Sequence, residues 1–309
     1  MSLPRPVVLG TRGSKLALVQ ANVCAERLRA AGLGIEVRTI KTTSERLPET
    51  PLSVIDRRDV FTRQLDEALF LGEIDLAVHS LKDVPTEVPE GLVLAAITER
   101  HDPWDVLVSD EGYDVDGLPE AAVVATSSLR RRAQLLHRRP DLKVVEIRGN
   151  VDTRVRKMRE GVADGLLLAR AGLTRLGLDV PHKVVPKEIM LPAVGQGALA
   201  VATLKQHPLR EIIRETLNHG PTEAAVRAER AMLHALQGGC RVPVGALGKI
   251  VYKDEVWLQG VVVSTNGVFM YRGEEVGEKP EEVGSRLARN LLEQGASVVL
   301  VNIREVRSE

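Results

Sequence analysis

Short apolar runs alternate with amphipathic stretches through the first third of this chain, and this alternation limits the fold more than any other feature. The predicted strands and helices are, in chain order, Val7–Leu9, Lys15–Ala30, Ile35–Ile40, Phe61–Leu71, Ile74–His79 and Leu92–Ile97. Strands that alternate with helices are typical of βαβ units and a parallel sheet. The pattern therefore predicts an α/β lobe.

The same alternation restarts after a turn-rich segment, Asp102–Pro119. The predicted elements of this second part are Ala122–Ala125, Ser128–Arg138, Val144–Ile147, Val151–Glu160 and Gly165–Ala169. They indicate a second α/β lobe.

A third block begins near Pro221, a residue well suited to the first turn of a helix. The elements expected from there are a helix to about Leu236 that ends at Gly238-Gly239, antiparallel strands at Val242–Ile250, Val256–Val263 and Phe269–Glu274, a helix at Glu281–Gln294, and a last strand. A length of 309 residues suits two or three compact domains. The third block thus predicts a small α+β domain.

Charge and cysteine content exclude several classes of function. Lys plus Arg and Asp plus Glu both number 42, so no overall field attracts nucleic acid or a membrane. The two cysteines, Cys24 and Cys240, are too few for a disulfide framework, and the seven histidines have no metal-ligand spacing. We expect a cytoplasmic protein without a structural metal, since no apolar signal or membrane-spanning stretch is present.

Three predicted strand-to-helix loops combine arginine with serine or threonine: Thr11–Ser14, Thr126–Arg132 and Arg148–Arg154. Each alone fits a capped helix with a solvated basic face, and a nucleic-acid patch is the other alternative. Ligands of open α/β sheets bind beyond the carboxyl ends of the strands, and arginine pairs well with carboxylates. Together the loops indicate a site for a compound with several carboxylates or phosphates.

Two further residues are candidates for chemistry. Asp83 follows an apolar strand in the run His79–Pro85, where it is either an acid/base group or a turn residue paired with Lys82. Neighbouring cations favour an ionised Asp83 that stabilises a cation. Cys240 follows Gly238-Gly239 and is either an attachment point or a buried, inert thiol, whereas Cys24 lies in an apolar helical pattern and is assigned to the core.

Six motifs in order carry a family resemblance that spans nearly the whole chain. They are Thr11–Ser14 with Leu16–Ala21, His79–Pro85, Thr126–Arg131, Arg148–Arg154, Leu191–Ala198, and Glu229–Ala231 through Cys240. With these motifs the chain resembles the porphobilinogen deaminase family, also called hydroxymethylbilane synthases.

The resemblance implies two lobes like those of type II periplasmic binding proteins around a cleft, and a smaller α+β domain with the cofactor cysteine. The implied domains are 1–98 with 194–216, 99–193, and 217–309. A dipyrromethane cofactor would be bound to Cys240 through a thioether. The enzyme would condense four porphobilinogen molecules onto it, release ammonia and hydrolyse off hydroxymethylbilane for haem biosynthesis. The resemblance also implies a monomer that passes its product to uroporphyrinogen-III synthase.

Residue roles follow from the same resemblance. Asp83 would stabilise cationic intermediates and move protons. The residues implied to hold the cofactor, besides Cys240, are Lys82, Thr126, Ser128, Arg130, Arg131 and Arg154. Those implied to hold the incoming substrate are Arg12, Ser14, Gln20, Arg148 and Arg175.

Some positions depart from the family pattern. Asp56–Phe61 stands where the family usually has Gly-Gly-Lys-Gly-Leu-Phe, and Ser44-Glu45 replaces Gly-Asp. Trp104 replaces a usual arginine and Arg170 a usual small residue.

The alternative function is a non-catalytic, two-lobed binder of a carboxylate-rich ligand, which needs the arginine loops but no thiol chemistry.

Overall fold

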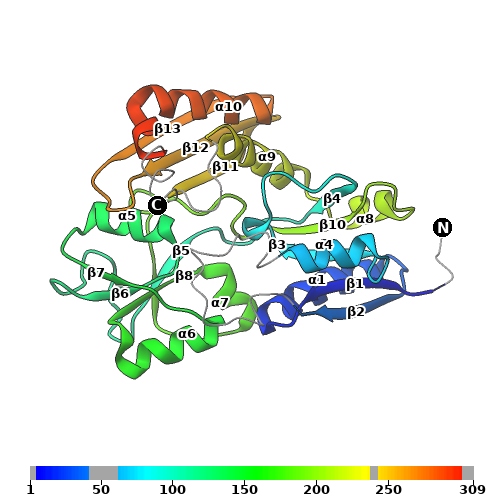
Figure 1. Ribbon diagram of the computed structural model, residues 1–309, viewed down its shortest axis with the longest axis horizontal. Helices are drawn as coiled ribbons and strands as arrows, with labels where there is room; N and C mark the ends of the chain where they lie inside the picture. Colours follow the sequence, from blue (N-terminus) through cyan, green and yellow to red (C-terminus); the bar gives the residue numbers. More distant parts are fainter. Residues whose placement is uncertain (1–4, 42–61, 237–242, 301–309) are drawn as a thin grey trace, which may run out of the picture. The chain divides into compact units, whose positions relative to one another are not determined.

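The computed structural model describes residues 5–41, 62–236 and 243–300 (Figure 1). Its chain forms two compact units. Unit 1 comprises Met1–His101 and Gly197–Glu223, and unit 2 comprises Asp102–Gln196 and Ala224–Glu309. The chain therefore leaves unit 1, builds part of unit 2 and then returns.

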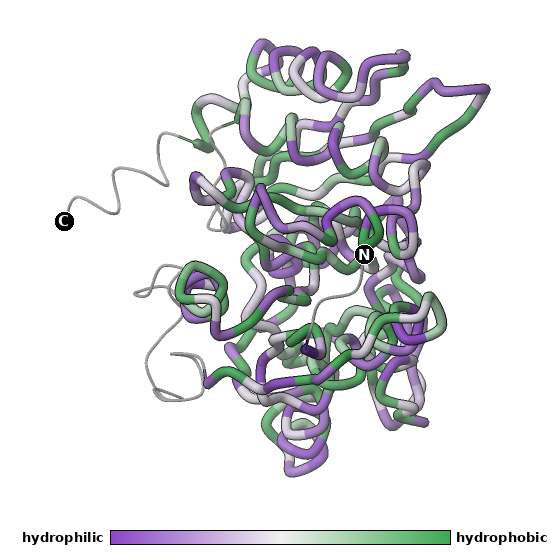
Figure 2. Tube along the Cα trace, turned by 90° about the vertical axis from the view of Figure 1, so that its right-hand side faces the viewer, coloured by the Kyte–Doolittle hydropathy of each residue, from purple (hydrophilic) through white to green (hydrophobic). Residues whose placement is uncertain are grey.

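Hydrophobic and hydrophilic residues alternate in short stretches along the described chain (Figure 2). Within those residues, no helix is long and apolar enough to cross a membrane. The apolar residues lie instead in several separate clusters, each inside a layered α/β or α+β arrangement.

Unit 1 has a mixed five-stranded sheet in the order β2-β1-β3-β10-β4. Its elements are β1 (Val7–Arg12), α1 (Lys15–Ala30), β2 (Ile35–Ile40), α4 (Arg63–Phe70), β3 (Leu76–Ser80), the short 3-10 helix η1 (Leu81–Asp83), β4 (Leu92–Ile97), β10 (Leu199–Leu204) and α8 (Arg210–Leu217). Strand β1 is parallel to β2 and β3, whereas β10 is antiparallel to β3 and β4. The β1, β3 and β4 runs and the α1 pattern were predicted from the sequence and are confirmed.

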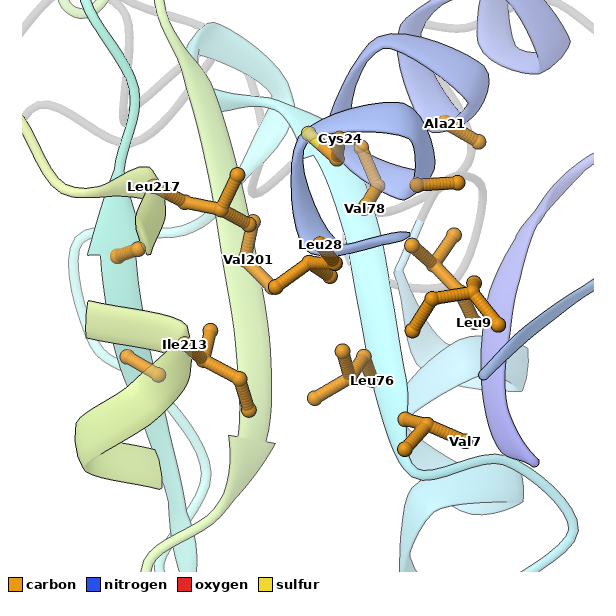
Figure 3. Close-up of a cluster of buried hydrophobic side chains, with 14 of the residues drawn as sticks. Val7, Leu9, Ala21, Cys24, Leu28, Leu76, Val78, Val201, Ile213 and Leu217 are labelled. Atoms are coloured by element: carbon orange, nitrogen blue, oxygen red, sulfur yellow. The ribbon is translucent and has the colours of Figure 1, made fainter. Parts of the chain in front are cut away.

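The core of unit 1 has one layer of helix on each face of the sheet. Cys24 and Leu28 of α1 lie against Leu76 and Val78 of β3 in one buried cluster (Figure 3). Helix α4 contributes Leu65 to a second cluster on the other face. Cys24 is fully buried, which confirms its assignment to the core.

The first part of unit 2 has a second five-stranded sheet, in the order β7-β6-β8-β5-β9. Its elements are β5 (Asp105–Val108), β6 (Val123–Ala125), α5 (Leu129–Arg138), β7 (Lys143–Val145), α6 (Val151–Lys157), the π-helical turn η2 (Met158–Val162), β8 (Gly165–Ala169), α7 (Arg170–Leu176) and β9 (His182–Val184). Strand β6 is parallel to β7 and β8, and β5 is antiparallel to β8 and β9.

The C-terminal part is α+β, as expected. Its elements are α9 (Gly220–Ala235), β11 (Val244–Tyr252), β12 (Glu255–Val263), β13 (Met270–Gly277), α10 (Pro280–Leu291) and the π-helical turn η3 (Leu292–Ala296). The three strands form an antiparallel sheet in chain order. Leu258 of β12 and Leu287 of α10 are buried in one cluster with Met232 of α9.

Three expectations were wrong in detail. Both large sheets are mixed rather than parallel, because β10 and β5 run against their neighbours. The segment expected as turns contains β5, a fully buried strand whose first residue, Asp105, is neutralised by two arginines. Residues 297–300 are helical and not a strand, because Val299 and Leu300 continue the apolar face that packs beside α10.

Candidate functional site

In unit 1, two polar loops lie at the same edge of the sheet. Strands β1 and β3 are parallel neighbours, so the residues that follow them come together. Arg12 ends β1, and Ser14 is the N-cap of α1, whose Oγ accepts a hydrogen bond from Ala17 N at 3.3 Å. Lys82 and Asp83 follow β3 in η1.

A pocket of about 110 Å³ lies at this edge. Its lining residues are Arg12, Ser14, Leu16, Ala17, Gln20, Val78, His79, Ser80, Lys82 and Asp83. The predicted residues Arg12, Ser14, Gln20, Lys82 and Asp83 are thus brought together. They place two cations and a carboxylate beside neutral hydrogen-bonding groups, which suits a ligand that carries both carboxylates and a positive charge.

Two lining residues hold each other in place. Gln20 of α1 and Ser80 of β3 form a hydrogen bond with Gln20 Nε2 2.9 Å from Ser80 Oγ. This bond links the N-terminal half of α1 to the end of β3 on the wall of the pocket.

His79 is a lining residue to which the sequence had assigned no role. It is only 6% exposed. Burial lowers the pKa of His79 to about 4, Asp83 acts in the opposite direction, and Arg12 lowers the pKa further. The imidazole is therefore neutral at physiological pH.

Unit 2 has a comparable edge beyond the carboxyl ends of β6 and β7, which are parallel. Thr126 Oγ1 accepts a hydrogen bond from Ser128 N at 3.2 Å, and Ser128 Oγ is the N-cap acceptor of α5. Each hydroxyl therefore keeps its hydrogen to donate to an anion. Arg148 lies in the loop after β7, and Arg154 lies on α6, where its Nε donates to Gly149 O.

Arg130 and Arg131 point into the interior of unit 2 and share one carboxylate. Asp105 Oδ2 lies 2.7 Å from Arg130 Nη1, and Asp105 Oδ1 lies 2.8 Å from Arg131 Nη2. Gln196 Nε2 donates to the same carboxylate at 2.9 Å, and Arg130 Nη1 also donates to Leu191 O. Both arginines are 6% exposed, so part of their hydrogen-bonding capacity is used within the protein.

The charge state of Asp105 follows from these contacts. Burial would raise its pKa, but the positive charges of Arg130 and Arg131 and the hydrogen bonds from Arg130 and Gln196 hold it well below its usual range. Asp105 is thus a buried carboxylate that remains ionised. One negative and two positive charges leave this cluster with an excess of one positive charge.

Several further positions were singled out in the sequence. Arg175 is in the last turn of α7 and half-buried. Arg170 Nη1 forms an ion pair with Asp102 Oδ2 at 2.7 Å, and its backbone N–H donates to Trp104 O. Cys240, together with the divergent segments Ser44-Glu45 and Asp56–Phe61, lies outside the described residues.

Three residues of these sites were not predicted: Asp105, Gln196 and the role of His79. Asp105 and Gln196 are distant in sequence from the arginines they contact, so no local spacing reveals them. The only available signal was the buried apolar run that follows Asp105 in β5.

Two family descriptions match most of the chain. Residues 7–210 match porphobilinogen deaminase, dipyromethane cofactor binding domain, and residues 224–293 match porphobilinogen deaminase, C-terminal domain. The chain belongs to the porphobilinogen deaminase family. This membership confirms the resemblance carried by the motifs, and it makes the chain a transferase of tetrapyrrole synthesis with a dipyrromethane cofactor.

Relatives match over almost their full length. Porphobilinogen deaminase of Rubrobacter xylanophilus is 66% identical over 301 residues, which cover 97% of this chain and 98% of that protein. The enzyme of Desulforudis audaxviator is 49% identical over 308 residues, with 97% and 98% covered. Among solved structures, the methionine-binding protein MetQ is similar with a TM-score of 0.45 and 15% identity, covering 68% of this chain and 89% of that chain.

Replacement of the shared carboxylate tests the cluster in unit 2. Asp105→Ala leaves two guanidiniums without their counter-charge in a buried place, so we expect a loss of about 3 to 5 kcal/mol in the free energy of unfolding. Urea denaturation measures it. The matched control is Asp116→Ala, which removes the exposed pair with Arg138 and should change stability little. If the two substitutions lowered the free energy of unfolding equally, Asp105 would not be the counter-charge that stabilises the two buried arginines.

The depressed pKa of His79 predicts a pH-dependent contribution to stability. The folded state favours the neutral ring, so this contribution is complete well above the unfolded pKa of 6.5 and is lost progressively as the pH falls from there to about 4. We expect the stability of the wild type relative to His79→Phe to fall by about 1.5 kcal/mol between pH 6.5 and pH 5. Urea denaturation of both proteins across this range is the measurement, and a constant difference would refute the prediction.

Proposed function

We propose that this chain condenses four porphobilinogen molecules, one after another, onto a dipyrromethane attached to Cys240, releases an ammonia at each step and hydrolyses the product to hydroxymethylbilane. The observation that carries the proposal is the pocket of unit 1, in which Arg12, Lys82 and Asp83 meet. Porphobilinogen carries an acetate, a propionate and an aminomethyl group on a pyrrole ring. The charges of the pocket complement all three.

The residues of unit 2 fit a cofactor with several carboxylates. Thr126 and Ser128 offer hydroxyl donors, and Arg154 offers a guanidinium on the neighbouring helix. We assign these residues, with Lys82 of unit 1, to the acetate and propionate groups of the cofactor. When bound, the dipyrromethane supplies the free pyrrole carbon to which the first substrate is joined.

Arg130 and Arg131 have a second task in this proposal. Their pairing with Asp105 fixes the guanidiniums, and both arginines are assigned to the cofactor. A single carboxylate cannot neutralise both cations, so the excess positive charge favours an anionic ligand nearby.

Arg12, Ser14 and Gln20 are assigned to the incoming porphobilinogen, together with Arg148 and Arg175 of unit 2. Arg12 is half-buried, which strengthens its attraction for a carboxylate relative to a fully solvated side chain. Ser14 lies at the start of α1, a helix whose first turn has no acidic residue to repel an anion.

Asp83 is assigned the central chemical role. When the carbon–nitrogen bond of the aminomethyl group breaks, its electron pair leaves with the nitrogen as ammonia, and the pyrrole becomes a cation. A carboxylate in the same pocket stabilises this charge and accepts a hydrogen bond from the pyrrole N–H. After the new carbon–carbon bond has formed, the same group can accept the proton that the ring must lose.

A non-catalytic binder of a carboxylate-rich ligand is the second candidate, since the arginine loops alone would serve it. Transfer of the product to uroporphyrinogen-III synthase, a monomeric state and a cytoplasmic location remain predictions, as do the three domain boundaries. The closing of both sheet edges on one cleft also remains a prediction.

Intact mass under denaturing conditions tests the covalent cofactor. Freshly purified protein should carry an adduct equal to two porphobilinogen molecules less two ammonia, because each joining step releases one ammonia. Cys240→Ser should abolish the adduct, whereas Cys24→Ala, a change at the buried cysteine of α1, should retain it. An active protein of unmodified mass would exclude Cys240 as the anchor.

Substitution of Asp83 tests the chemical step. Asp83→Asn preserves the side chain's shape and removes its charge, so we expect the adduct to remain while turnover of porphobilinogen falls about a hundredfold or more. The measurement is hydroxymethylbilane formation together with the mass of the stalled protein. Asp179→Asn, at an exposed position, is the control and should behave as wild type. Wild-type turnover of the Asp83 variant would remove this residue from the mechanism.

A further inference from the structure

One polar side chain of the unit 1 pocket has no assigned task. His79 lines the pocket, is 94% buried and, among the described residues, has no hydrogen bond to its ring. A polar side chain that lines a pocket and is not engaged elsewhere in the protein is placed to form a hydrogen bond with a ligand.

Hydrogen bonds orient the other neutral polar side chains of the pocket. Ser14 Oγ accepts the N–H of Ala17, and the side chains of Gln20 and Ser80 bond to each other. The ring of His79 takes part in neither of these bonds, and as a neutral group it can accept a hydrogen bond from a ligand.

The surroundings of His79 define what it can bind. The charged groups of the pocket are Arg12, Lys82 and Asp83, and across the sheet His79 pairs with Ala200 of β10. Its ring is uncharged at neutral pH because of its burial. An uncharged imidazole has one nitrogen that donates and one that accepts a hydrogen bond.

We propose that His79 accepts a hydrogen bond from the aminomethyl ammonium of porphobilinogen and thereby selects a pyrrole that bears this leaving group. This inference rests on the proposed function. The two cations of the pocket suit the carboxylates of the substrate and repel its ammonium, so the ammonium needs a neutral acceptor or a carboxylate. A charged imidazolium in place of the neutral ring would repel it as well.

The neutral charge state of His79 also matters for the release of ammonia. An ion pair with a second carboxylate would hold the ammonium as an ion and oppose the departure of neutral ammonia. A neutral imidazole gives a weaker bond, and the ring forms and breaks no covalent bond itself. His79 is thus a substrate-contacting residue whose effect falls on substrate binding and not on the bond-breaking step.

Two ligands separate this role from a merely structural one. The first is porphobilinogen, and the second is the same pyrrole dicarboxylate with a methyl group in place of the aminomethyl group. For His79→Phe we expect a KM for porphobilinogen about tenfold to a hundredfold higher than that of wild type, as for loss of a hydrogen bond to a charged group. The Kd of the methyl compound, measured by calorimetry, should change by less than about threefold. His79→Gln, which restores an acceptor, should recover most of the affinity.

A control variant and a spectroscopic measurement complete the test. His101→Phe, at an exposed histidine of unit 1, should leave both ligands unaffected. In wild-type protein with ¹⁵N-labelled histidine, the acceptor nitrogen of His79 should shift when the unreactive aminoethyl homologue of porphobilinogen binds, and not when the methyl compound binds. This measurement needs no folded His79→Phe variant.

Two results would overturn the proposal: equal losses for both ligands, which would assign His79 to the shape of the pocket, or an unchanged KM with no ¹⁵N shift. Neither result touches the proposed function. That function fails only if the wild type itself carries no adduct and forms no hydroxymethylbilane.

Discussion

The ionised carboxylate of Asp105 organises unit 2. It opens β5, receives two guanidiniums from the first turn of α5, and receives the amide of Gln196 from the segment that leads back to unit 1. Removing charged groups from water is costly, and the cost is recovered only when their geometry and hydrogen bonds are nearly complete. An inner strand of the sheet, the start of α5 and the return segment are therefore held at one point.

This constraint also explains the limits of prediction from the sequence. The bounds of α1, β2, β4 and β8 agree with the periodic patterns, because in those elements local propensity and burial favour the same structure. Strand β5 was missed because its charged first residue reads as part of a polar turn, and only distant arginines make it suitable for burial.

Much of the candidate site could be anticipated because parallel strands deliver their loops to one edge. That rule alone groups Arg12 with Asp83, and it groups Thr126 with Arg148. It could not distinguish an arginine that faces a ligand from one that faces the interior. Arg130 and Arg131 were both assigned to the cofactor by resemblance, and their buried pairing became visible only when distant parts of the chain were placed together. Likewise, His79 is polar in the sequence, and its burial depends on helices and strands from elsewhere.

Strand β10 lies between β3 and β4, yet it is made only after the entire five-stranded sheet of unit 2 has been synthesised. On the ribosome, β3 and β4 therefore emerge with a missing neighbour, and their unsatisfied edges must wait while the next lobe forms. Of the two five-stranded sheets, the one begun first is therefore completed last. Because β10 is synthesised late, the first sheet cannot be completed until the second sheet has left the ribosome. The edges of β3 and β4 stay exposed during this time, and chaperones that cover them would be useful.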